Sequence, residues 1–305
     1  MIDNQSLKVK LQTIQNLEVR FNYSLKEHTT FKVGGPTDIF ATPFSLNALK
    51  KLLKATKNQD LDRFILGEGS NIIVADKGVS GLVINMTELN KIKVKDTDLI
   101  AQTGATLTAL ADKALAAGLT GVEFATGIPG SLGGALYMNA GAYGGEIKDV
   151  VTKVLCLNET GEEIMLSKEE VDLSYRHSIF QEKDLIAFEA HIELDKGDER
   201  QIKEKMDDLN QKRWAKQPME MPSAGSIFKR PVDHYAGALI EAAGLKGTKV
   251  GDAQVSTKHA GFIVNLGSAT AQDIKRLIKK VQHKVYQKSG IKLEIEPKFI
   301  GDFTD

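Results

Sequence analysis

The sequence predicts an α+β chain of three unequal domains. Its 305 residues exceed the size at which one hydrophobic core keeps growing, so we expect more than one domain. Helix-like and strand-like patterns alternate, and a charged stretch at 195–218 separates the strand-rich middle of the chain from its last part. We therefore expect domains at residues 1–88, 89–210 and 211–305.

The expected first domain opens with a helix-like stretch and two strand-like runs that are broken by Gly-Gly-Pro at 34–36. Strands at 65–66 and 72–74 flank a short glycine turn at 67–71. Between these parts, Ser45 is a helix cap. The apolar face of the helix that it starts consists of Leu46, Leu49, Leu52 and Leu53.

The middle of the chain contains a predicted helix at 107–117, and a long glycine-rich segment follows it at 126–145. Strand-like alternation dominates residues 151–194, and we expect a strand around 171–180. The charged stretch after it carries a single apolar stripe, which predicts a solvated amphipathic helix. The stripe consists of Ile202, Met206 and Leu209.

The last part alternates again, with a helix at 236–243 and a strand at 259–266. Thr270 and Asp273 form a capping-box pattern at the start of a helix that Gly290 ends. Apolar and charged residues then alternate over 291–296, which predicts a strand with Glu294 and Glu296 on one face.

The composition limits the functional classes. Lys and Arg number 40 and Asp and Glu number 40, which argues against a broad surface for nucleic acid or membrane. Cys156 is the only cysteine, so an intrachain disulfide and a cysteine-rich metal site are excluded. The start resembles no signal peptide, and no run approaches the roughly 18 apolar residues of a membrane span. We expect an unprocessed cytoplasmic monomer without a metal.

The glycine-rich segment is the densest functional signal. Glycines lie at 127, 130, 133, 134, 141, 144 and 145, and main-chain N–H groups at such positions can approach a diphosphate closely. The segment lacks the Gly-Lys-Ser/Thr of a Walker loop, and "GEGSN" at 67–71 lacks the glycine spacing of a dinucleotide-binding Rossmann unit. We expect a nucleotide site; the alternative is that the glycines only form tight turns.

Three further residues are candidates for a function, and each also has an ordinary structural interpretation. Arg176 in "SYRHS" has a planar fork suited to a carboxylate or phosphate, but a lone arginine is more often a surface ion-pair residue. Ser226 in "PSAGSIFKRP" does not match the Gly-x-Ser-x-Gly of a hydrolase, so it is not expected to be a nucleophile, although nothing excludes a partnership with His259. By spacing alone, Glu296 is an outward-facing strand residue.

Seven motifs, taken together and in this order, closely resemble the UDP-N-acetylenolpyruvoylglucosamine reductase family, also called UDP-N-acetylmuramate dehydrogenase. The resemblance covers roughly residues 23 to 302 and favours the shorter, second type of this enzyme. The motifs are "TTFKVGGP", "LGEGSNIIV", "GIPGSLGGALYMNAGAYGGEI", "SYRHSIF", "PSAGSIFKRP", "AGALIEAAGLKG" and "IEPKFIG".

The resemblance implies a two-domain FAD-binding unit of the vanillyl-alcohol-oxidase/cytokinin-type class, followed by a C-terminal α+β substrate-binding domain. It implies noncovalent FAD, NADPH as hydride donor and a role in peptidoglycan synthesis, hence in cell-wall biogenesis, cell shape and cell division. The implied reaction reduces the enolpyruvyl ether of UDP-N-acetylglucosamine-enolpyruvate to UDP-N-acetylmuramate.

The resemblance also implies a role for each matching residue. Arg176 would hold the enolpyruvyl carboxylate, Ser226 would donate the proton, and Glu296 would complete the catalytic site. The implied substrate-binding residues are Tyr175, Arg213, Lys216 and His259. The implied FAD contacts are Gly67, Glu68, Gly69, Ser70, Asn71, Thr126, Gly127, Ile128, Pro129, Gly130, Ser131, Gly133, Gly134, Asn139, Ala140 and Gly141.

Two departures narrow this transfer. The family's usual Phe-Lys-Asn-Pro reads Phe-Lys-Arg-Pro here, so the resemblance assigns no role to Arg230. The loop with a substrate-clamping tyrosine, found in the larger type, has no room after the Tyr-Arg motif. Two alternatives stay open: an oxidase of the same fold with another substrate, and a nonenzymatic sugar-nucleotide binder without a flavin.

Overall fold

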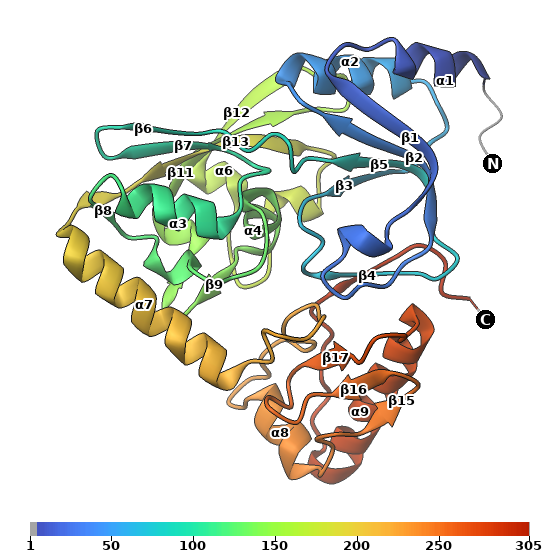
Figure 1. Ribbon diagram of the computed structural model, residues 1–305, viewed down its shortest axis with the longest axis vertical. Helices are drawn as coiled ribbons and strands as arrows, with labels where there is room; N and C mark the ends of the chain where they lie inside the picture. The colour runs from blue at the N-terminus through green and yellow to red at the C-terminus, as the bar shows by residue number, and fades with distance from the viewer. Residues whose placement is uncertain (1–4, 305) are drawn as a thin grey trace. The chain divides into compact units, whose positions relative to one another are not determined.

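A computed structural model describes residues 5–304 and divides the chain into two compact units (Figure 1). The first unit takes in the chain up to Phe21, Asp38–Glu68 and Gly81–Gln211. The second takes in Asn22–Thr37, Gly69–Ser80 and the chain from Lys212 onward. The division into three domains, with boundaries at residues 88 and 210, stays a prediction.

The first unit contains two larger sheets. One has the strand order β1-β2-β5-β3, with β3 parallel to β5. The other has the order β12-β11-β13-β7-β6, and all its pairs are antiparallel. The helical elements of the first unit include α3 and α4, which Figure 1 shows on one side of the second sheet. The bounds of the elements follow in chain order: α1 Gln5–Gln12, β1 Leu17–Ser24, β2 Pro36–Pro43, α2 Leu46–Thr56, β3 Arg63–Leu66, β5 Val79–Asn85, β6 Ile92–Lys95, β7 Asp98–Gln102, α3 Leu107–Leu115, β8 Leu119–Thr120, η2 Glu123–Ala125, α4 Leu132–Met138, β9 Gly141–Ala142, β10 Gly145–Glu146, α5 Ile147–Val150, β11 Val151–Leu157, β12 Glu163–Ser167, α6 Lys168–Val171, η3 Ile179–Gln181, β13 Ile186–Glu193, β14 Asp195–Lys196 and α7 Glu199–Lys216.

Each sheet of the first unit has its own hydrophobic core. Ser45 caps α2 by accepting from the Ala48 N–H, and the predicted leucines at 49, 52 and 53 are fully buried against β2 and β5. On the second sheet, Leu110 of α3 and Leu136 of α4 pack in one cluster with residues of β7, β11 and β13. The glycine-rich segment, which contains α4, is thereby attached to the core of the second sheet.

The second unit is built around α9, whose apolar face is buried. Thr270 accepts from the Asp273 N–H and the Asp273 side chain accepts from the Thr270 N–H, so the predicted capping box is present. Phe31 and Ile73, distant in sequence, belong to the same core as α9. The bounds of the elements are η1 Lys26–His28, β4 Ile72–Val74, α8 Ala236–Ala242, β15 Lys249–Val250, β16 Ala253–Val255, β17 Ile263–Asn265, α9 Ala271–Ser289 and β18 Lys298–Ile300.

The predicted strand around 171–180 is wrong. Ser167 and Glu170 form a capping box that starts the short helix α6, and η3 follows a turn at 174–177. Arg176 lies in that turn with φ of 57°, a left-handed conformation that a strand does not contain. Local capping therefore outweighs the alternation of side chains.

The predicted strand at 291–296 is also wrong. Ile295 makes only an isolated bridge to Phe228, and the nearest strand is β18, which begins after Pro297 and pairs in parallel with β4. Proline lacks a backbone N–H, and β18 starts at the first residue after it, Lys298.

No helix within residues 5–304 combines the length and the apolar character needed to cross a bilayer.

Glu123 is a buried carboxylate at the start of η2. It accepts hydrogen bonds from the Thr120 hydroxyl, the Gly121 N–H (3.1 Å) and the Lys205 ammonium of α7 (3.2 Å). Burial alone would raise the pKa of this carboxyl, but the bonds from Thr120, the backbone and Lys205 outweigh burial and lower the pKa. The ionised form of Glu123 therefore stabilises the folded first unit.

We expect Glu123→Gln to lower the free energy of unfolding by about 1–3 kcal/mol near neutral pH, because an amide nitrogen would face donors in a buried place. A folded-state pKa below the unfolded one gives stability that is present above the unfolded pKa and lost as the pH falls through the folded pKa. The difference between wild type and variant should therefore narrow in acid. Urea denaturation near neutral pH and in acid measures this difference in stability, with the exposed Glu204→Gln as control. Equal stability of wild type and Glu123→Gln near neutral pH contradicts the prediction.

Candidate active site

The first part of the glycine-rich segment, residues 126–131, connects η2 to the start of α4. Thr126 and Ser131 are buried at its two ends, whereas the residues between them are half-buried or exposed. Gly130 has φ of 144°, which only glycine adopts readily, and Ser131 caps α4 by accepting from the Gly134 N–H. The segment thus presents main chain at its surface and keeps its hydroxyls at its anchored ends.

Gly67 and Gly133 pack closely against neighbouring residues. A Cβ on Gly67 would lie 2.0 Å from the Ser131 hydroxyl oxygen, and one on Gly133 would lie 3.1 Å from the Thr103 Cβ. The Gly133 N–H donates to the Thr103 carbonyl at 2.8 Å. The structure therefore brings the predicted cofactor residues Gly67, Ser131 and Gly133 together around Thr103, which the sequence analysis missed.

Asn139 ends α4 in the left-handed conformation, with φ of 43° and no exposed surface. Its amide nitrogen donates to the Glu146 carboxylate (2.8 Å) and to the Ser174 carbonyl (3.2 Å). Its amide oxygen accepts from the Lys148 N–H at 2.9 Å. Asn139, predicted as an FAD contact, therefore links the end of α4 to the hairpin of β9 and β10 and to the turn that carries Arg176.

The turn at 174–177 is closed by two main-chain bonds between Ser174 and His177 (3.2 and 3.1 Å). Tyr175 is 53% exposed, and the Arg176 guanidinium lies 5.0 Å from the centre of its ring. On its other side, the His177 imidazole lies within 3.4 Å of Asp172 and 3.5 Å of Glu182. Arg176, predicted to bind the carboxylate, and Tyr175, predicted to bind the substrate, thus stand at the tip of one tight turn.

The residues between Thr126 and Ser131 fit a dinucleotide diphosphate that is held by main-chain groups, because they lie at the surface and Gly127 and Gly130 have φ of 67° and 144°, which glycine adopts readily. Of the remaining predicted contacts in this unit, Glu68, Ala140 and Gly141 are half-buried, and Gly141 lies in β9. Burial raises the pKa of the Cys156 thiol to about 12, so this sulfur is not a thiolate near neutral pH.

In the second unit, Gly69 lies against the segment that follows η1. A Cβ on Gly69 would lie 2.1 Å from the His28 carbonyl oxygen, and the Thr30 N–H donates to the Gly69 carbonyl at 3.2 Å. The Thr30 hydroxyl donates to the Ser223 carbonyl at 2.6 Å. Thr30, which the sequence analysis did not single out, therefore connects a predicted FAD contact to the Ser226 loop.

The remaining predicted contacts of this turn are half-buried. They are Ser70 and Asn71, and the Asn71 carbonyl accepts from the Lys298 N–H at 3.0 Å.

The extended segment that contains Ser226 lies between the segment that contains Phe262 and the segment that contains Glu296. Ser226 bridges Phe262, and the Ile227 N–H donates to the Gly261 carbonyl at 2.9 Å. The Ile227 carbonyl accepts from the Glu296 N–H at 2.9 Å, which places Glu296 directly beside this segment. The Ser226 hydroxyl donates to the Phe228 carbonyl over a long 3.3 Å.

His259 belongs to the same part of the second unit. Its Nδ1 accepts from the Gly261 N–H at 3.1 Å, and Phe262 meets its ring edge to face with centroids 5.0 Å apart. A Cβ on Gly261 would lie 3.0 Å from the His259 ring and 3.7 Å from the Ser226 hydroxyl, so Gly261 separates these two groups. Burial, the largest influence, lowers the pKa of His259 and favours the neutral imidazole with its proton on Nε2.

The other predicted substrate residues, Arg213 and Lys216, lie near the end of α7. Arg213 is buried and its Nη1 donates to Gln217 at 3.4 Å, whereas Lys216 is exposed. Arg230 is exposed and stacks over Tyr235 at 4.2 Å. A role for Arg230 in the site stays unassigned.

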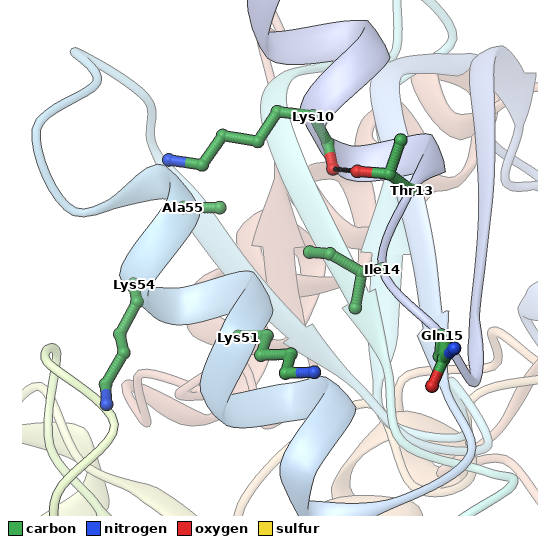
Figure 2. Close-up of a pocket in the computed structure, with 7 residues that line it drawn as sticks. All are labelled: Lys10, Thr13, Ile14, Gln15, Lys51, Lys54 and Ala55. Carbon is green, nitrogen blue, oxygen red and sulfur yellow. Dashed lines mark hydrogen bonds between the residues drawn. The ribbon is translucent and has the colours of Figure 1, made fainter.

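A cavity of about 520 Å³ lies between α1 and α2, and none of the residues that line it is a predicted site residue (Figure 2). Figure 2 shows three lysine side chains around it, Lys10, Lys51 and Lys54, with Thr13 donating to the Lys10 carbonyl. Among residues 5–304, no group of three or more His, Cys, Asp or Glu side chains is arranged to hold a metal ion.

Two family models match the chain. An FAD binding domain matches residues 37–167, and the C-terminal domain of UDP-N-acetylenolpyruvoylglucosamine reductase matches residues 217–300. The predicted fold class, an FAD-binding unit followed by a separate C-terminal α+β domain, is thereby confirmed.

Relatives named UDP-N-acetylenolpyruvoylglucosamine reductase match nearly the whole chain. The protein of Caldanaerobacter subterraneus subsp. tengcongensis is 49% identical over 92% of this chain and 93% of its own. That of Clostridium novyi is 46% identical over 100% of both. The crystal structure of the Thermus caldophilus enzyme superimposes with a TM-score of 0.80 at 34% identity, covering 93% of this chain and 98% of that one. The chain therefore belongs to the UDP-N-acetylenolpyruvoylglucosamine reductase family, and it is an oxidoreductase with an FAD-binding domain.

Proposed function

We propose that the protein reduces the enolpyruvyl ether of UDP-N-acetylglucosamine-enolpyruvate to the lactyl ether of UDP-N-acetylmuramate, a step of peptidoglycan synthesis. The observation that carries the proposal is the grouping of Ser226, His259 and Glu296 around one extended segment, in a chain 46–49% identical to named reductases over nearly its full length. The overall reaction consumes NADPH and one proton, because two electrons and two hydrogens enter the double bond.

The FAD-binding domain implies where the electrons pass. When bound, FAD would supply the redox chemistry that carries a hydride from NADPH to the methylene carbon of the substrate. The chain's own part is to hold the diphosphate with main-chain groups at 126–131, where Gly127 and Gly130 have φ of 67° and 144°. The buried Thr126 and Ser131 fix these residues at both ends.

Arg176 is proposed to hold the substrate carboxylate. Addition of hydride to the methylene carbon pushes negative charge toward the carboxylate, and a guanidinium fork binds that group through two parallel hydrogen bonds. Its position at the tip of a closed turn, with the backbone at φ 57°, leaves little freedom to the residue that carries the fork. Tyr175 beside it supplies a ring face for the cation.

Ser226 is proposed to donate the proton to the neighbouring carbon. Its hydroxyl points to the Phe228 carbonyl over 3.3 Å, a long bond that a rotation of the side chain breaks at little cost. Gly225 before it has φ of 70°, a left-handed conformation that glycine adopts readily and that sets how the chain enters Ser226. The Ser226 hydroxyl is therefore a proton donor held by one long hydrogen bond.

His259 and Glu296 are proposed to assist Ser226 in this protonation. With Nδ1 accepting from Gly261, a neutral His259 presents an Nε2 proton to an anionic substrate oxygen. The main-chain bond from Glu296 to Ile227 fixes the carboxylate's residue beside Ser226, where it orients the hydroxyl or the substrate. Arg213 and Lys216 are proposed to meet the UDP-sugar.

A cytoplasmic location, a monomeric state and independence of nucleic acid and membranes belong to the same proposal. The balanced charge of 40 basic and 40 acidic residues supports them, as does the single, free and buried Cys156.

We expect FAD to be bound without a covalent link, because the buried Cys156 thiol is protonated and the proposed cradle is main chain. Acid precipitation should leave the polypeptide colourless and the supernatant yellow, as measured by visible absorbance. Cys156→Ala is the matched control and should release its flavin equally. Yellow colour that precipitates with the wild-type chain contradicts the prediction.

We expect Ser226→Ala to retain FAD and its reduction by NADPH, but to slow reoxidation by the enolpyruvyl substrate about 10²- to 10⁴-fold, the range for a lost general acid. Stopped-flow absorbance resolves the two half-reactions. Ser226→Cys should fall between wild type and alanine, since a thiol can still donate. Ser223→Ala, three residues earlier, is the control and should be near wild type. A slowed NADPH step, or unchanged reoxidation in Ser226→Ala, rules out Ser226 as the acid.

A further inference from the structure

Gln181, at the end of η3, donates from one amide nitrogen to two main-chain carbonyls. The bond to Tyr137 measures 2.8 Å and the bond to Arg176 measures 3.0 Å. Both partners are acceptors only, so the nitrogen and not the oxygen of the amide must face them. One half-buried side chain thus joins the last turn of α4 to the residue proposed to grip the substrate carboxylate.

Further bonds tie the same two segments together. The hydroxyl of fully buried Ser178 also donates to the Tyr137 carbonyl, at 2.9 Å. The Asn139 amide donates to the Ser174 carbonyl at 3.2 Å, at the start of the turn. The turn at 174–177 is therefore attached to α4 on both sides, and Gln181 is the attachment that acts on Arg176 itself.

The backbone of Arg176 needs such an attachment. A non-glycine residue in the left-handed region is strained, and the strain persists only where surrounding contacts fix it. The carbonyl of Arg176 moves with its φ and ψ angles, so a donor 3.0 Å from that oxygen fixes the direction in which the side chain leaves the turn.

The carboxylates near His177 are weaker supports for the turn. Asp172 and Glu182 have side chains that are 66% and 60% exposed, and ion pairs at such exposure contribute little. Gln181 is neutral, half-buried and bonded to two carbonyls, so neither salt nor pH removes its bonds.

We propose that Gln181 is a positioning residue for Arg176: it holds the Arg176 backbone against α4, so that the guanidinium meets the substrate carboxylate in one orientation. The proposal rests on the proposed function of Arg176. Because α4 starts at Ser131 in the predicted FAD segment and ends beside Tyr137, the same helix also sets the distance between that segment and the turn.

The experiment compares Gln181→Ala and Gln181→Glu with wild type in both half-reactions. Glutamate keeps the shape of glutamine, but its carboxylate faces two carbonyl oxygens and cannot donate. We expect both variants to retain FAD and to be reduced by NADPH at the wild-type rate. Reoxidation by the enolpyruvyl substrate should slow about 10- to 100-fold, as for other displaced positioning groups. The exposed neighbour Lys183→Ala is the control.

A double-mutant cycle with Arg176→Lys separates this proposal from the function on which it rests. If Gln181 acts through Arg176, Gln181→Ala slows the Arg176→Lys enzyme much less than it slows wild type. Equal slowing in both backgrounds, or wild-type reoxidation by Gln181→Ala and Gln181→Glu, overturns the proposal. Loss of FAD from these variants overturns it too, because it assigns Gln181 to the support of α4 alone. Arg176→Lys that is reoxidised at the wild-type rate refutes the proposed role of Arg176 instead.

Discussion

The burial of Asn139 at the end of α4 is the constraint on which the first half of the site depends. A fully buried amide must find partners for its donors and its acceptor, and Asn139 finds them at Glu146, Ser174 and Lys148. Each partner lies on a different segment, so satisfying one side chain fixes the hairpin, the helix end and the Arg176 turn together. The predicted cofactor segment and the predicted substrate arginine are thereby parts of one packed piece.

The second unit reaches a similar result without a buried side chain of this kind. Its site residues come from segments that are far apart in sequence, and single main-chain bonds hold them side by side: Ile227 to Gly261 on one side and Glu296 to Ile227 on the other. Backbone pairing sets the spacing of the segments, and the missing side chain at Gly261 leaves room for the His259 ring. A methyl group there would press on that ring at 3.0 Å and would make only an ordinary contact with the Ser226 hydroxyl at 3.7 Å.

Sequence patterns predicted the helices with strong caps and long apolar faces, such as α2 and α9, because these signals are local. They failed at 171–180 and 291–296, where a capping box and a proline outweigh short alternation. The glycine-rich segment was recognised from composition, and Arg176, Ser226 and Glu296 were singled out by the family resemblance. Gln181 and Thr30 were missed because their partners lie 44 and 193 residues away, at distances where no single-sequence pattern operates.

The lowered pKa of His259 limits how the Ser226 side of the site can work. A histidinium beside Ser226 would stabilise an alkoxide strongly, but burial removes that charge near neutral pH. A neutral imidazole offers one hydrogen bond from Nε2, which suits a substrate oxygen that becomes anionic only during the reaction. In the proposed mechanism, the positive charge comes from the guanidinium of Arg176, which binds the substrate carboxylate. A fixed cation for the carboxylate and neutral donors around the proposed acid would keep the hydroxyl proton on Ser226 until negative charge has developed on the substrate.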